Sequence, residues 1–157
     1  MLFPDLDDDA LFLSRSDESE VLGTHCLDSF ELEGMVWPSI EHYYQAMKFQ
    51  ESAPSHYQKI CQAKTAKQAR RLGRSRFSAI RKDWSDVKRV VMTRAVYTKC
   101  KTHEVIRETL LASNERKILE NSQYDYYWGC GRDRRAENTY GKVLMDVRKK
   151  LREEQSA

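Results

Sequence analysis

The chain has 157 residues, of which 40% are hydrophobic, 32% charged and 10% aromatic. This length suits one domain with a real hydrophobic core, and the composition excludes a disordered chain, a collagen and a disulfide-rich scaffold. No segment approaches the ~20 consecutive apolar residues of a membrane-spanning helix. The acidic N-terminus also lacks the basic start and the small-residue cleavage site of a secretory signal.

Charge is divided unevenly along the chain. The formal net charge is only +3, but residues 1–41 hold eleven acidic residues and one basic residue, whereas residues 42–157 carry a net +13. The densest basic stretch is 64–101, with 13 Lys and Arg opposed by two Asp. Such a stretch favours a partner rich in phosphate or carboxylate, which could be a polymer or a small molecule.

The cysteines give no sign of a metal site. The four lie far apart, form no Cys-x-x-Cys motif and have no histidine at metal-ligand spacing, so neither a metal nor another cofactor is expected. Isolated thiols in a chain without a secretory signal are typical of a reducing compartment, and the expected location is the cytoplasm.

Elements are predicted in chain order from hydrophobic periodicity and turn residues. The acidic segment 1–28 is irregular, with one short apolar stretch at 11–13, and residues 29–37 alternate around Gly34 as a β-hairpin does. Helices are predicted from Ser39 onward and over 54–63, 65–72, 83–100 and 103–113, then a short strand over 117–121, a loop over 123–137 and a final helix capped by Asn138. The expected fold is mainly α with a small β-hairpin or sheet (α+β), as one compact domain over 29–152.

Two of these helices carry more detailed expectations. Gly73 is expected to end the 65–72 helix as the residue just beyond it. In the 83–100 helix, an apolar stripe that includes Val90 and Val91 should face the core, and Lys99 should lie on a solvent-facing side.

The segment 37–49, W-P-S-I-E-H-Y-Y-Q-A-M-K-F, combines a helix start with polar residues on one face. Glu41, Gln45 and Lys48 recur at i, i+4 and i+7, so their polar ends could converge on one small site. Glu41 lies in the first turn, where the helix dipole favours the ionised carboxylate. It could act as a base or stabilise a developing cation, or it could simply complement the dipole.

Two further segments contain residue types suited to ligand binding. In R-K-D-W, residues 81–84, Trp84 could stack on a planar ring while Arg81 meets a phosphate, or it could anchor the helix end in the core. The loop 124–135 contains Asp125, Trp128 and Gly129, and a glycine there would let backbone approach a ligand closely. The alternative is an aromatic loop that plugs the edge of the core.

Together these residues suggest a pocket with two carboxylates, two indole rings and several cations. That set suits cleavage at a ribose carbon, because carboxylates stabilise an oxocarbenium-like transition state and activate water. The indoles would hold a flat leaving group, and the cations would hold a phosphate and orient the substrate.

The same motifs resemble the NADAR (YbiA-like) family. The match includes residues 37–49, L-G-R at 72–74, R-K-D-W, D-Y-Y-W-G-C-G from Asp125 and G-K-V-L-M-D-V-R at 141–148, in the family's order. The resemblance implies a compact, mostly α, YbiA-like fold and N-glycosidase activity. It also implies a substrate: phosphorylated ribosylamino-pyrimidine intermediates of riboflavin biosynthesis, releasing ribose 5-phosphate, or ADP-ribose on guanine in nucleic acid.

The resemblance also implies roles for individual residues. The family's catalytic Glu falls on Glu41, its pocket Trp on Trp84, and its Asp and Trp of D-x-x-W-G on Asp125 and Trp128. Lys48 is expected to contact phosphate or to orient Glu41. Two departures stand out: residues 21–30 lack the family's S-N-F segment, and an Ala replaces the Gly two residues before the last helix cap.

The resulting hypothesis is an N-glycosidase without metal or cofactor, acting on a small phosphorylated ribosyl substrate and not on a membrane. Glu41 and Asp125 would be catalytic, and Trp84, Trp128, Lys48, Arg81 and Gly129 would bind substrate. Which carboxylate activates water is left open. Three alternatives are also kept: an ADP-ribosyl-guanine glycohydrolase on nucleic acid, a non-catalytic ADP-ribose or nucleotide-binding module, and a nucleic-acid binder using the 64–101 stretch.

Overall fold

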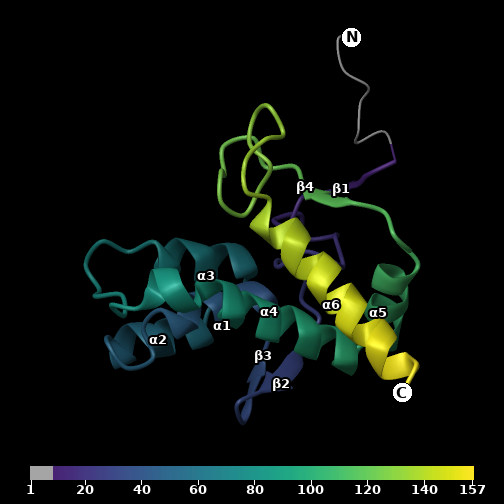
Figure 1. The fold of residues 1–157 in the computed structure, drawn as a ribbon. Coiled ribbons are helices and arrows are strands. Elements are labelled where there is room, and N and C mark those ends of the chain that lie inside the picture. Colours follow the sequence, from purple (N-terminus) through teal and green to yellow (C-terminus); the bar gives the residue numbers. More distant parts are fainter. Residues whose placement is uncertain (1–8) are drawn as a thin grey trace.

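The computed structural model describes residues 9–157, and the first eight residues of the predicted acidic segment lie outside them. Over the described residues, six helices and four three-residue strands make the expected α+β architecture (Figure 1). The helices are α1 (Ile40–Met47), α2 (Pro54–Cys61), α3 (Ala66–Gly73), α4 (Trp84–Thr102), α5 (Glu104–Leu111) and α6 (Thr139–Gln155), and the strands are β1 (Leu11–Leu13), β2 (Phe30–Leu32), β3 (Met35–Trp37) and β4 (Ile118–Glu120). None of the helices in this part of the chain is long and apolar enough to cross a membrane.

The strands form two separate pairs. β2 and β3 make the predicted hairpin, with Phe30 opposite Trp37. Its two turn residues, Glu33 and Gly34, both have positive φ (56° and 78°), as the tight turns favoured in hairpins require. β1 pairs in parallel with β4 (Figure 1), so the apolar stretch at 11–13 is a strand within the domain.

Helix α1 lies at the centre of one half of the molecule. All eight of its residues are buried, and it packs against α2, α3, α4 and β3. Ser39 caps it as predicted, since its Oγ accepts a hydrogen bond from the backbone N–H of His42 (3.2 Å). The His42 ring is fully buried, with Nδ1 2.7 Å from Ser39 Oγ and Nε2 2.9 Å from the Ala63 carbonyl. His42 therefore packs and fixes the start of α1.

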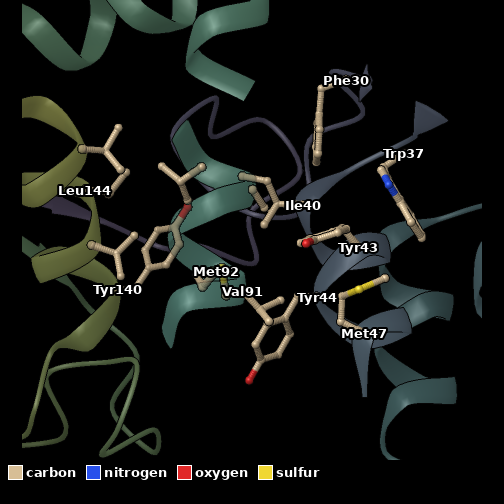
Figure 2. Close-up of a cluster of buried hydrophobic side chains, with 14 of the residues drawn as sticks. Phe30, Trp37, Ile40, Tyr43, Tyr44, Met47, Val91, Met92, Tyr140 and Leu144 are labelled. Atoms are coloured by element: carbon tan, nitrogen blue, oxygen red, sulfur yellow. The ribbon is translucent and has the colours of Figure 1, made fainter. Parts of the chain in front are cut away.

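Helix α4 separates the two halves of the core. It contacts α1 on one side and α6 on the other, as Figure 1 shows. Figure 2 shows the apolar side chains between these helices, among them Tyr43 from α1, Met92 from α4 and Leu144 from α6. A large apolar cluster thus holds α1 rigidly, and with it every polar group that α1 presents.

The structure corrects two expectations about α4. Val90 is 57% exposed, whereas Val91 faces the core as expected, together with Ala95 and Val96. Lys99 is only 2% exposed, because its Nζ donates hydrogen bonds to the carbonyls of Val21 (2.8 Å) and Gly23 (3.3 Å). Lys99 Nζ also lies 2.6 Å from Cys26 Sγ. Helical periodicity cannot predict a buried lysine whose hydrogen-bond partners belong to an irregular segment.

Helix α6 begins where expected, but its cap works differently. Asn138 adopts a left-handed conformation (φ 50°) and makes no side-chain cap hydrogen bond. Its amide instead donates to the Ile118 carbonyl (2.9 Å) and accepts from the Glu120 N–H (2.8 Å). Asn138 therefore joins the start of α6 to β4.

Residues 9–28 pack into the same core as the rest of the chain. Leu13 and Leu22 are buried in the main apolar cluster. Arg15 is also buried, and it forms an ion pair with the completely buried carboxylate of Glu120 (2.9 Å). Residues 9–28 therefore share one apolar core with the domain expected over 29–152.

Candidate functional site

The carboxylate of Glu41 is buried and held at both oxygens. The residue is 4% exposed. Oε2 accepts a hydrogen bond from Thr24 Oγ1 (2.8 Å), and Oε1 accepts one from Gln45 Nε2 (2.7 Å). The Glu41 backbone N–H also donates to the Thr24 carbonyl (3.0 Å). The predicted convergence of Glu41 and Gln45 is confirmed. The other side chain that donates to the Glu41 carboxylate, Thr24, belongs to the segment before β2.

Gln45 is itself fixed by a close contact with α3. Its Oε1 is buried without a hydrogen-bond partner among the described residues. A Cβ built on Gly73 would collide with this oxygen, so Gly73 is needed for the close approach of α3 to α1. Gly73 is the last residue of α3, and its φ is not in the left-handed region, so the expectation that it follows the helix is wrong.

Lys48 lies one turn beyond Gln45 over an aromatic surface. Its Nζ is 5.6 Å from the ring centroid of Tyr44 and 5.9 Å from that of Trp84, and it donates to the Gly73 carbonyl (3.3 Å). Burial lowers the pKa of Lys48 to about 8, although the negative charge of Glu41 opposes this effect. A lysine with a lowered pKa can bind an anion while charged and act as a base or nucleophile when neutral.

The two predicted indoles are brought together by Tyr44. The Tyr44 ring centroid lies 5.1 Å from that of Trp84 and 5.6 Å from that of Trp128, and Trp128 Nε1 donates to the Tyr44 hydroxyl (3.2 Å). Trp128 is buried and Trp84 is half-buried. Trp84 is therefore the more accessible of the two for a flat ligand.

Asp125 organises the loop between β4 and α6. Its Oδ1 accepts hydrogen bonds from the backbone N–H groups of Tyr127 (3.1 Å) and Trp128 (2.7 Å), and its Oδ2 pairs with Arg15 (2.5 Å). Burial opposes ionisation of Asp125, but the Arg15 guanidinium and the two N–H groups outweigh it and lower the pKa of Asp125. Oδ1 thus holds the backbone of the loop at Trp128, and Oδ2 ties the loop to Arg15.

Gly129 serves the packing of that same loop. A Cβ at this position would lie 2.7 Å from Glu120 Oε2 and 2.8 Å from the Asp125 carbonyl. The neighbours that demand a glycine are thus residues of the chain itself. The predicted reason, a close approach of backbone to a ligand, is not needed to explain Gly129.

A basic cavity of about 630 Å³ opens next to His25, a neighbour of Glu41. Its wall is formed by Ser16, Glu18, His25, Lys67, Arg70, Arg71 and Arg74. His25 connects it to the carboxylate, since His25 Nδ1 is 3.8 Å from Glu41 Oε2. The basic stretch of the sequence thus contributes α3 to a concave site, and among the described residues no three His, Cys, Asp or Glu gather as a metal ion would need.

Arg81 lies elsewhere. Its guanidinium pairs with Asp83 at the surface (Nε–Oδ1 2.6 Å), and both residues line a separate hollow of about 410 Å³ with Met47 and Glu51. The structure therefore brings Glu41, Lys48, Trp84 and Trp128 to one region through Gln45 and Tyr44, and leaves Arg81 outside it.

Sequence reasoning missed several residues of this region. Arg15, Thr24 and His25 had no assigned role, and the cations of α3 were expected to meet phosphate only as part of the whole basic stretch 64–101. Arg15 did carry a signal, because it is the one basic residue in an acidic stretch of 41. Thr24 and His25 carried a weaker one, because they lie in the segment 21–30 that departs from the family pattern.

The fold and the site define an α+β domain with a fixed, buried carboxylate that lies 3.8 Å from a histidine in the wall of a basic cavity. The NADAR domain model matches residues 2–152. A protein of Nostoc punctiforme named as an N-glycosidase is 39% identical over 133 residues, which cover 81% of this chain and 85% of that protein. The chain therefore belongs to the NADAR family.

Two other similarities extend this result. The NMR structure of the Escherichia coli protein YbiA matches with a TM-score of 0.80 and 30% identity, covering 92% of this chain and 87% of that one. A riboflavin biosynthesis protein of Vibrio vulnificus is 38% identical over 125 residues, covering 80% of this chain and 34% of that larger protein. The YbiA-like fold expected from the resemblance is thereby confirmed.

Proposed function

We propose that this protein hydrolyses the C–N glycosidic bond of a phosphorylated ribosylamino-pyrimidine and releases ribose 5-phosphate. The enzyme class, a hydrolase of N-glycosyl bonds, follows from the family and from the relatives named as N-glycosidases. The observation that carries the substrate is a cavity walled by Lys67, Arg70 and Arg71 of α3 and by Arg74 directly after it. Its wall residue His25 lies 3.8 Å from the buried Glu41 carboxylate. The name of the Vibrio vulnificus relative supports the link to riboflavin intermediates.

The arrangement suits an oxocarbenium-like transition state. When the C1′–N bond stretches, positive charge develops on the ribose, and a fixed carboxylate nearby stabilises it without reorganisation. Thr24 and Gln45 hold the Glu41 oxygens in place. The cations of α3 would bind the 5′-phosphate, and this binding would orient C1′ toward Glu41.

A second candidate is hydrolysis of ADP-ribose from guanine in nucleic acid. One observation favours it: Lys67, Arg70, Arg71 and Arg74 together offer more positive charge than one phosphate monoester requires. A diphosphate carries more negative charge and more acceptor oxygens, so it could pair with more of these four cations. A non-catalytic ADP-ribose-binding module would use the same wall but would never release product.

The test compares substrates on the purified protein. Ribosylamino-pyrimidine phosphate and an ADP-ribosylated guanine oligonucleotide are incubated separately, and product is followed by mass spectrometry. We expect ribose 5-phosphate from the first at a kcat/KM at least tenfold above that for the second. Faster release of ADP-ribose would favour the second candidate. Tight binding without product from either would favour the binding module, and strongly salt-dependent binding of unmodified DNA or RNA would favour a nucleic-acid binder.

A further inference from the structure

His25 stands between Glu41 and the cavity. It is 5% exposed and belongs to the cavity wall. Its Nδ1 lies 3.0 Å from Thr24 Oγ1, the hydroxyl that also contacts Glu41 Oε2. Nothing in the family assignment gives His25 a task, and it belongs to the segment that departs from the family pattern.

The hydrogen bonds fix how this histidine is protonated. A carboxylate only accepts, so the single Thr24 hydroxyl proton points to Glu41 Oε2 at 2.8 Å in preference to the neutral Arg15 carbonyl at 3.2 Å. The Thr24 oxygen must then accept from His25, which places the ring proton on Nδ1. The other nitrogen, Nε2, carries a free lone pair.

That lone pair is available to a ligand. Among residues 9–157, the hydrogen bond from His25 to Thr24 is made by Nδ1, and Nε2 has no protein partner. Nε2 is also absent from the fully enclosed polar atoms that lack a partner, so it is accessible from the cavity. A neutral, oriented imidazole whose far nitrogen is fixed by a carboxylate through a hydroxyl is the arrangement of a general base.

We propose that His25 is the base that activates the attacking water, with Glu41 and Thr24 fixing its tautomer while Glu41 stabilises the ribosyl cation. The inference rests on the proposed function. Nε2 takes one proton as the water oxygen bonds to C1′. The C1′–N electron pair leaves with the pyrimidine amine, which takes a proton from solvent, and the imidazolium then returns its proton to solvent. One water is thus divided between ribose 5-phosphate and the amine.

The charged groups around the ring favour the neutral form. Burial lowers the pKa of His25, and the cations Arg70 of α3 and Arg15 lower it further, while the carboxylates of Glu41 on α1 and of Glu18 raise it. The net direction is downward from the ordinary value of 6.5. The lone pair of Nε2 is therefore free at pH 7 and is lost as the pH falls through the pKa of the folded protein.

The experiment measures the pH dependence of kcat and KM for the wild type and for His25→Asn. We expect the wild type to lose activity on the acid side with a midpoint below about 6.5. We expect His25→Asn to lower kcat by about 100-fold, to leave KM within about threefold, and to remove that acid limb. His103→Asn, which alters a histidine that contacts the Ser29 carbonyl, is the matched control and should keep both kcat and the limb.

A second measurement does not depend on folding of the variant. Nitrogen chemical shifts of the wild-type histidines should show His25 protonated at Nδ1 near pH 7. Protonation at Nε2 instead, or an unchanged acid limb in a folded His25→Asn variant, would overturn the role of His25 while leaving the proposed function standing. Absence of turnover by the wild type would remove the proposed function itself, and the base role with it.

Discussion

At the scale of single residues, the two side chains that donate to the Glu41 carboxylate, Gln45 and Thr24, differ in whether the sequence predicts their contact with Glu41. Gln45 follows Glu41 by one helical turn, so their contact follows from helix geometry alone. Thr24 is 17 residues earlier in an irregular segment, and no local rule places it against Glu41. Lys48, Trp84 and Trp128 were predicted as site residues, but the Tyr44 ring that joins them was not.

The cations of α3 and Arg81 are expected to differ in their effect on phosphate binding, because they lie in different hollows. Arg70 lines the cavity, whereas Arg81 is paired with Asp83 in another hollow. We expect Arg70→Gln to raise KM for the phosphorylated substrate by about 10-fold or more, as loss of one charge-assisted contact would, with a smaller change in kcat. Arg81→Gln is the matched control, measured in the same steady-state assay, and should leave KM unchanged. The reverse pattern would return the phosphate site to Arg81.

Lys48 is expected to lower the stability of the fold through its buried charge and yet to be needed for turnover. Its pKa is about 8 in the folded protein against an ordinary value of 10.5, so the folded state binds fewer protons between these values and stability rises with pH across that window. At pH 7 the charged lysine therefore destabilises the fold. We expect Lys48→Met to raise the free energy of unfolding by about 1–3 kcal/mol at pH 7 and to abolish most turnover.

Urea unfolding at pH 7 and at pH 10 checks this prediction, because the gain should shrink at the higher pH. Lys59→Met, at an exposed position on α2, is the control and should change stability by less than about 0.5 kcal/mol. A Lys48→Met variant less stable than the wild type at pH 7 would show that the ammonium contributes favourably.

At the scale of elements, the helices and the hairpin were predictable, and the errors concern what their ends contact. Gly73 looks from sequence like the residue just beyond a helix, but it is the last residue of α3 and is pressed against Gln45. Asn138 is correctly placed at a helix start, yet its side chain bonds β4. Local signals find such residues, while the partner of each belongs to the tertiary structure.

Gly73→Ala tests the contact between α3 and α1. In a helix this change normally stabilises by about 0.5–1 kcal/mol. Here the added methyl group meets the Gln45 side chain, so it must move the amide away from Glu41. We expect kcat to fall by about 10-fold, roughly the equivalent of 1.4 kcal/mol, with no gain in stability.

The control is a double-mutant cycle with Gln45→Ala. Most of the effect of Gly73→Ala on kcat should disappear when the Gln45 amide is absent, because the two changes act through one contact. Strictly additive effects in this cycle would mean that Gly73 does not act through Gln45.

At the scale of the whole molecule, the charge asymmetry has a structural meaning. The acidic stretch contributes Ser16, Glu18 and His25 to the same cavity whose other wall is the basic helix α3. Net charge alone could indicate an anionic partner, but only packing shows that the basic stretch forms one side of a concave site. The role of Arg15 has the same origin, since it joins the acidic stretch to Glu120 of β4 and to Asp125 of the loop.

Arg15→Met tests this joint. Glu120 is fully buried, and removing its cation leaves a buried carboxylate without its charged partner. We expect a loss of about 3–5 kcal/mol in the free energy of unfolding, measured by urea titration. Arg116→Met, whose exposed side chain reaches the exposed Asp9, should cost less than about 1 kcal/mol. Equal losses of unfolding free energy in the two variants would show that the buried ion pair contributes no more to stability than the exposed one.

The central claim, that the fixed Glu41 carboxylate drives N-glycosidic cleavage, is tested most directly by the turnover of Glu41→Gln on ribosylamino-pyrimidine phosphate. This variant keeps the size of the side chain and removes its charge, and Glu108→Gln, at an exposed position on α5, is the matched control. We predict that kcat falls by about 10²–10⁴-fold in Glu41→Gln and stays within about twofold in Glu108→Gln. Full turnover by a folded Glu41→Gln protein would contradict the claim.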